Sequence, residues 1–138
     1  MSRLQLAIDV ADLDKAVDFY SRLFNTKPAK VRPGYANFAI SDPPLKLVLF
    51  EDTGGGGTIN HLGVEAETTE EVVAAEARLT VSDLDTTGVE DTMCCYAEKT
   101  ETWVAGPDGV RWEFYVKRAD SEQLANPAVA DDTPDCCG

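Results

Sequence analysis

The chain has 138 residues, of which 43% are hydrophobic, a size and composition that suit one folded domain with a buried core. It carries 12 Lys and Arg against 25 Asp and Glu, and this net charge of −13 disfavours nucleic acid and anionic membranes as partners. The sequence has no apolar stretch with the length of a membrane span or the pattern of a signal peptide, so we expect a cytoplasmic protein whose four cysteines stay reduced.

The first half of the chain predicts one helix and four strands. Residues 3–10 alternate between apolar and polar side chains, which is typical of a half-buried strand. Asp12 is a candidate N-cap for a helix that ends near Asn25, because apolar residues follow it at helical spacing. Turn-forming residues then separate three apolar segments, which predict strands at about residues 28–32, 35–40 and 45–51.

The second half repeats this order. Residues 60–66 alternate again, and Thr68 with Glu71 forms a capping box ahead of a second helix. Further apolar runs near residues 93–98, 101–105 and 110–117 predict three more strands. We therefore expect an α+β fold of two tandem βαβββ modules, about residues 1–57 and 58–118, within one domain of residues 1–120.

The C-terminal segment, residues 121–138, differs from the rest of the chain. It is acidic and shows no hydrophobic periodicity, so we expect it to be disordered. It contains an adjacent pair of cysteines, Cys136 and Cys137, which we interpret as accessory thiols.

Three polar residues on the predicted strands are candidate metal ligands. A shift of 56 residues places Gln5 on His61, and both point away from the apolar face of their strands. Glu113 stands among aromatic residues, where a buried carboxylate is costly unless it binds a cation. One amide, one imidazole and one carboxylate leave coordination positions open, as catalytic metal sites do.

Each of these residues also has a structural interpretation. His61 is the only histidine and could be a hydrogen-bonded packing residue. Glu113 could instead pair with Arg111 or Lys46, the cations that stand closest to it when the two modules are compared.

The adjacent residues Cys94 and Cys95 are the most unusual feature of the sequence. Neighbouring Cα atoms lie about 3.8 Å apart, whereas bridged cysteines are usually separated by about 4.4 to 6.8 Å, so we interpret the pair as two free thiols. Side chains on a strand point alternately to opposite faces, and only a turn or an irregular loop would aim both thiols at one ligand.

Several segments resemble the vicinal oxygen chelate superfamily, which includes glyoxalase I, bleomycin resistance proteins and extradiol dioxygenases. The resemblance is closest to the branch of organoarsenical carbon–arsenic lyases and cadmium-induced proteins. The segments that carry it are R-P-G-Y-A-N-F-A-I (32–40), D-P-P-L-K-L-V-L (42–49), N-H-L-G-V-E (60–65), C-C-Y-A (94–97) and W-V-A-G-P-D-G-V-R-W-E-F-Y (103–115). It implies two βαβββ modules that pair around a metal-containing cleft.

The resemblance also implies a function. Gln5, His61 and Glu113 match the family's metal-binding catalytic residues, with Fe(II) as the cofactor, and Cys94 with Cys95 matches its arsenic-binding pair. Soft thiolates suit trivalent arsenic, a soft centre. We therefore expect a non-haem Fe(II)- and O2-dependent dioxygenase, a monomer or a homodimer, that cleaves the carbon–arsenic bond of methylarsenite or trivalent aromatic arsenicals and releases arsenite.

Two other functions remain open at this point. The same cleft suits a metal-dependent enzyme of the glyoxalase or thiol-transferase type. The cysteines alone suit a non-enzymatic protein that binds cadmium or arsenite.

Overall fold

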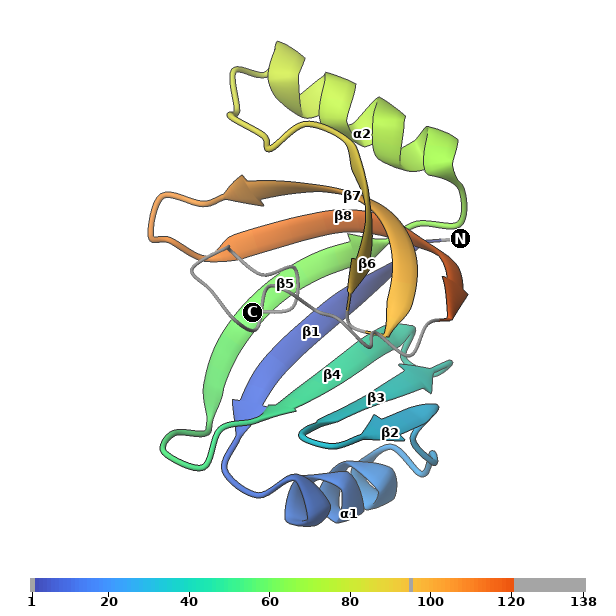
Figure 1. Ribbon diagram of the computed structural model, residues 1–138, viewed down its shortest axis with the longest axis vertical. Helices are drawn as coiled ribbons and strands as arrows, with labels where there is room; N and C mark the ends of the chain where they lie inside the picture. The colour runs from blue at the N-terminus through green and yellow to red at the C-terminus, as the bar shows by residue number, and fades with distance from the viewer. Residues whose placement is uncertain (1, 95, 121–138) are drawn as a thin grey trace. The chain divides into compact units, whose positions relative to one another are not determined.

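The computed structural model describes residues 2–94 and 96–120, with the side chains of Cys94 and Asp120 excepted. The expectations for Cys95, Cys136, Cys137 and the tail lie outside the described residues. The elements follow the predicted order, βαβββ twice, which confirms the α+β class (Figure 1). They are β1 (Arg3–Val10), α1 (Leu13–Leu23), β2 (Lys30–Arg32), β3 (Tyr35–Ile40), β4 (Leu45–Glu51), β5 (Thr58–Glu65), α2 (Thr69–Val81), β6 (Glu90–Cys94), β7 (Ala97–Ala105) and β8 (Arg111–Asp120).

The described residues form two compact units, a first unit of Arg3–Gly63 and a second unit that contains Ser2 and the described residues from Val64 onward. In the first unit the strand order is β2, β3, β4 and β1, with β5 next to β1. β1 and β4 are parallel, and Gln5 lies opposite Lys46 in their register. Side chains at such paired positions share a face of the sheet, so Gln5 and Lys46 lie on the same side.

The opposite face of this sheet forms the hydrophobic core of the first unit. Asp12 caps α1 by accepting a hydrogen bond from the Lys15 backbone N–H, as predicted. The Leu13 N–H donates to Glu51 Oε2 at 2.9 Å, which ties the start of the helix to the end of β4. The buried members of the core are Leu13, Ala36, Phe38, Ile40, Leu47 and Leu49.

In the second unit β7 lies between β8 and β6, and all pairings are antiparallel. The predicted capping box is present, since Thr68 accepts from the Glu71 N–H and the Glu71 side chain accepts from the Thr68 N–H. α2 buries Val72 and Leu79 and packs against β7 and β8.

The predicted strand at residues 93–98 is wrong in one respect that matters for the cysteines. β6 ends at Cys94 and β7 begins at Ala97, and Tyr96 has a φ of 61°, in the left-handed region. A positive φ in a residue with a side chain is typical of a turn. The two segments therefore form a hairpin, and Cys94 is the last residue of its first strand.

No helix among the described residues is long and apolar enough to cross a membrane.

Candidate functional site

Gln5 and His61 are buried polar residues of the first unit. Gln5, on β1, is 6% exposed, and His61, on β5, is 1% exposed. Among the described residues, Gln5 Oε1 has no hydrogen-bond donor within reach. A buried amide oxygen without a donor costs free energy, and a bound cation would remove that cost.

A short chain of hydrogen bonds orients the imidazole ring of His61. The Asn60 Nδ2 group donates to Asp9 Oδ1 at 3.1 Å, and Asn60 Oδ1 lies 2.8 Å from His61 Nδ1. Because an amide oxygen can only accept, this network assigns the proton to Nδ1 and the lone pair to Nε2. Metal-binding histidines are commonly held in one tautomer by such a partner on the other nitrogen.

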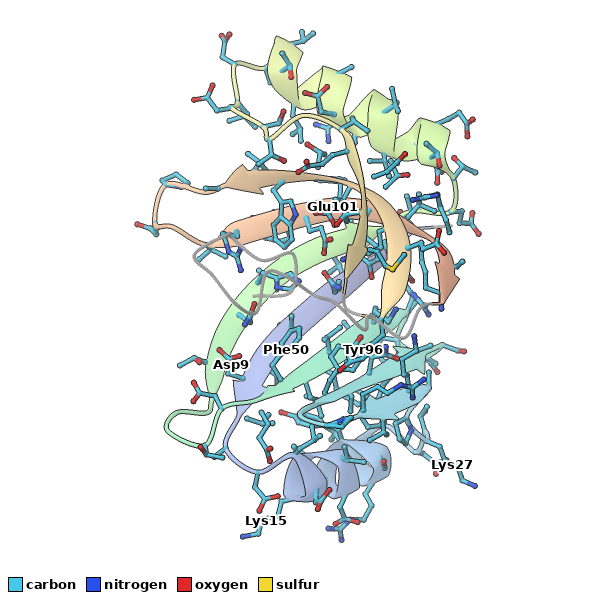
Figure 2. The ribbon with its side chains drawn as sticks, viewed as in Figure 1. Asp9, Lys15, Lys27, Phe50, Tyr96 and Glu101 are labelled. Carbon is cyan, nitrogen blue, oxygen red and sulfur yellow. The ribbon has the colours of Figure 1, made fainter. Side chains whose placement is uncertain are left out.

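Aromatic residues pack near His61 in the first unit. Phe50, labelled with Asp9 in Figure 2, has its ring centre 6.4 Å from that of His61. The ring of Tyr35 packs edge-on against that of Phe50, with 5.6 Å between the ring centres. Phe38, by contrast, belongs to the hydrophobic core on the opposite face of the sheet, so it has no part in a site that uses Gln5.

Glu113 lies on β8 in the second unit and is fully buried. Its Oε2 atom accepts a hydrogen bond from Lys99 Nζ at 2.8 Å. Lys99 is thus one cation paired with Glu113, and Arg111 places its guanidinium 4.9 Å from the ring centre of Trp103. The pair with Lys99 offsets part of the cost of burying this carboxylate.

Glu101 adds a second carboxylate to this cluster. Its Oε1 atom lies 3.5 Å from Lys99 Nζ, and both side chains are 4% exposed. Burial, and after it repulsion by Glu113, raise the pKa of Glu101 from its ordinary value of 4.5 to about 7, although attraction by Lys99 opposes the increase. When both carboxyls are ionised, Lys99 balances one of the two charges and the cluster is negative by one, which favours an additional cation.

This pKa predicts how stability depends on pH in the metal-free protein. Between pH 4.5 and 7 the folded state holds a proton on Glu101 that the unfolded state releases, so the free energy of unfolding falls as the pH rises. Glu101→Gln removes this penalty, so we expect its free energy of unfolding to exceed that of wild type by about 3 kcal/mol at pH 8. The difference should disappear below about pH 4.5, where both states are protonated.

Urea unfolding of both proteins at several pH values measures this difference. Glu98→Gln, which removes a 40% exposed carboxylate from the same strand, controls for the loss of one negative charge. A Glu101→Gln protein that is less stable than wild type at pH 8 would contradict the prediction.

The donor set formed by Gln5, His61 and Glu113 suits a metal ion with open coordination positions. Among the residues that the structure describes, no group of three His, Cys, Asp or Glu side chains forms a metal-binding cluster, and the predicted set contains only two such residues. The structure describes Gln5 and His61 in one unit and Glu113 in the other. Their convergence on one metal therefore stays a prediction.

Cys94 is the last residue of β6, opposite Ala97 at the start of β7. Glu113 lies opposite Trp103, six residues further along β7, or about 20 Å at the spacing of an extended strand. The backbone at Cys94 and the carboxylate at Glu113 thus belong to opposite ends of β7, and the structure does not bring them together. Cys95 lies outside the described residues.

Sequence analysis missed Asn60, Lys99 and Glu101. A polar residue next to the only histidine was a usable signal for Asn60, because ligand histidines need a partner. The charges at Lys99 and Glu101 occupy strand positions that share the face of Glu113, and the alternation of β7 could have identified them.

Comparison with known proteins matches the chain to a protein family and to several relatives. Residues 3–114 match the family described as the Glyoxalase/Bleomycin resistance protein/Dioxygenase superfamily. A trivalent organoarsenical cleaving enzyme from Thermomonospora curvata is 54% identical over 138 residues, which cover 99% of this chain and 89% of that protein. The cadmium-induced protein CadI from Mycobacterium tuberculosis is also 54% identical, over 99% of this chain and 93% of that protein.

Solved structures are similar at the level of the fold. The Mn(II)-bound glyoxalase from Novosphingobium aromaticivorans is 17% identical, with a TM-score of 0.62, and the match covers 91% of this chain and 44% of that one.

Proposed function

Because the chain belongs to the Glyoxalase/Bleomycin resistance protein/Dioxygenase superfamily, we propose that it is a non-haem Fe(II)-dependent dioxygenase that cleaves the carbon–arsenic bond of trivalent organoarsenicals. The names of three relatives support this substrate class, at 54%, 37% and 32% identity, each over 99% of this chain. The reaction would consume O2 and release arsenite.

The orientation of His61 is the main observation that supports the proposed metal site. Asp9 and Asn60 hold the ring so that Nε2 presents its lone pair, which is the state that a metal ligand requires. Gln5 Oε1 offers a buried oxygen with no donor among the described residues, and Glu113 supplies a carboxylate that shares Lys99 with a second carboxyl, that of Glu101. Gln5, His61 and Glu113 would hold Fe(II), and the bound iron would supply the activation of O2.

The thiols of Cys94 and Cys95 would bind the arsenic. Trivalent methylarsenite has two exchangeable oxygens and one carbon, so two thiolates can replace both oxygens and leave the carbon–arsenic bond exposed for reaction. Cys94 is the last residue of β6, and the left-handed conformation of Tyr96 is typical of a turn, which is the setting in which two adjacent thiols could reach one ligand.

Asn60→Ala tests the orientation of His61. Without the Asn60 oxygen the ring loses its partner at Nδ1, and we expect the affinity for Fe(II) to fall about 10- to 100-fold. Thr58→Ala is the matched control, since it removes another hydrogen bond to Asp9 and leaves the contact between Asn60 and His61 intact. Anaerobic Fe(II) titration measures the affinity, and equal affinities in the two variants would contradict the role of Asn60.

The 54% identity to CadI supports a second candidate, a protein that binds cadmium or arsenite without catalysis. Arsenic speciation and O2 uptake separate the candidates. The dioxygenase should consume O2 and form arsenite when methylarsenite, Fe(II), a small thiol and air are all present. A protein that binds methylarsenite tightly, takes up no O2 and forms no arsenite would be the binding protein, and turnover of a thiol adduct without O2 would indicate a glyoxalase-type enzyme.

A further inference from the structure

Lys99 is a buried lysine of the second unit, and its ammonium group lies between two carboxyls. Nζ lies 2.8 Å from Glu113 Oε2 and 3.5 Å from Oε1 of Glu101, which is labelled in Figure 2. The contact with Glu113 is a hydrogen bond, whereas Glu101 Oε1 has no hydrogen-bond donor among the described residues. The hydrogen bond from Lys99 is therefore directed at the carboxylate that is assigned to the metal.

The ammonium group of Lys99 is held in place by its surroundings. Nζ lies 5.0 Å from the centre of the Tyr115 ring, which is a cation–π contact, and Tyr115 OH donates to Glu65 Oε2 at 3.2 Å. The backbone carbonyl of Lys99 accepts from Arg118 Nη2 at 3.4 Å. Because both ends of the residue are held, its hydrogen bond also fixes the orientation of the Glu113 carboxylate.

This hydrogen bond distinguishes the two oxygens of Glu113. Oε2 accepts from the ammonium group, so a metal ion that leaves this bond intact would bind Oε1. Carboxylates that bind metals are commonly hydrogen-bonded by a neighbouring group that orients them. Binding through one oxygen instead of two also keeps a further coordination position open, as a catalytic metal site requires.

We propose that Lys99 is a positioning residue of the metal site, which holds Glu113 Oε2 and directs Oε1 toward the metal. The inference rests on the proposed function, since Glu113 is a metal ligand only in that proposal.

Two other roles of Lys99 predict the opposite effect on metal affinity. An ammonium group that only balanced the charge of the carboxyls would repel the metal ion, and one that took the place of the metal would compete with it. In both cases removal of Lys99 should strengthen metal binding. Removal of a positioning residue should weaken it.

A double substitution removes the hydrogen bond without changing the net charge of the ionised cluster. Lys99→Met with Glu101→Gln removes one positive and one negative charge, and we expect Fe(II) to bind this variant about tenfold or more weakly than wild type. Glu101→Gln alone keeps the bond between Lys99 and Glu113 and should lose much less affinity. Lys117→Met removes the same charge at an exposed position opposite Lys99 and should bind Fe(II) like wild type.

Anaerobic Fe(II) titration measures these affinities, and circular dichroism checks the fold of each variant. Co(II) adds a spectroscopic readout, because its visible absorption weakens as its coordination number rises. With both oxygens of Glu113 able to bind, the double variant should absorb less per bound Co(II) than wild type, an effect that a purely structural role of Lys99 does not predict. A folded double variant that binds Fe(II) as tightly as wild type, or more tightly, would overturn the proposal.

The wild-type protein provides a test that does not depend on the folding of the double variant. A buried, hydrogen-bonded ammonium group exchanges slowly with water and gives a nitrogen NMR signal, which Lys99→Arg identifies by its loss. This signal should persist when the protein is saturated with Zn(II), a diamagnetic probe of the site, and its disappearance would show that the metal displaces Lys99 and would overturn the proposal. A protein whose metal affinity depends on Lys99 but that forms no arsenite would refute the proposed reaction and support the positioning role.

Discussion

Replacing His61 with alanine is expected to abolish both Fe(II) binding and the release of arsenite. The change removes the only imidazole of the chain and leaves an amide and one carboxylate as protein ligands. Loss of a ligand should cost more than the 10- to 100-fold that loss of an orienting partner typically costs. Metal analysis after anaerobic loading, together with arsenic speciation, measures both effects.

Two further variants separate the loss of a ligand from the loss of the fold. His61→Gln keeps a hydrogen-bonding side chain in the buried position next to Asn60, and it should fold normally and still bind little iron. Gln5→His replaces a neutral amide with a stronger ligand and should keep the fold and much of the metal affinity. A folded His61→Ala protein that binds iron stoichiometrically and turns over would rule out the metal assignment.

Replacing either Cys94 or Cys95 with serine is expected to remove nearly all cleavage of methylarsenite while Fe(II) binding is retained. A single thiolate leaves one oxygen on arsenic and lets the substrate rotate and dissociate, so the orientation that makes the step nearly unimolecular is lost. Arsenite formation from methylarsenite in the presence of Fe(II), a small thiol and air is the measurement.

The oxidation state of arsenic provides a control for this experiment. Pentavalent methylarsenate, which thiolates do not capture without prior reduction, should be inert with the wild-type protein. If the double serine variant formed arsenite from methylarsenite at the wild-type rate, the adjacent cysteines would not be the substrate site.

The repeat in the sequence predicted much of the fold, because the two modules show the same periodicities and the same kind of helix start. Asp12 and the capping box of Thr68 with Glu71 are local features, in which one side chain satisfies backbone groups a few residues away. Such features can be predicted from spacing alone. The superfamily assignment from short segments was confirmed by the match over residues 3–114.

The ion pair between Lys99 and Glu113 could not be predicted from residue spacing. Lys99 lies opposite Lys117 in the register, and its long side chain reaches Glu113. The Lys99 Nζ atom lies 5.0 Å from the centre of the Tyr115 ring. The strand pairing is also irregular beside it, with a bulge between Glu98 and Lys99. A diagonal contact of this length depends on the three-dimensional path of the side chain, whereas sequence comparison of the modules indicated Arg111 and Lys46.

The turn between β6 and β7 also could not be predicted from the sequence. The apolar run at residues 93–98 contains neither Gly nor Pro, which are the usual signals for a chain reversal. The turn instead uses a left-handed conformation at Tyr96, which a single sequence does not reveal.

The buried cluster of Lys99, Glu101 and Glu113 constrains how this protein and its relatives can diverge. Changing Lys99 alone leaves two buried carboxyls without this cation, a change that typically costs several kcal/mol, whereas a neutral residue at position 101 leaves the pair of Lys99 and Glu113 intact. The loss of Lys99 should therefore be accompanied by the loss of a carboxyl along evolutionary lineages. A relative that keeps the carboxylate at position 113 but has an apolar residue at position 99 is expected to have a neutral residue at position 101 as well.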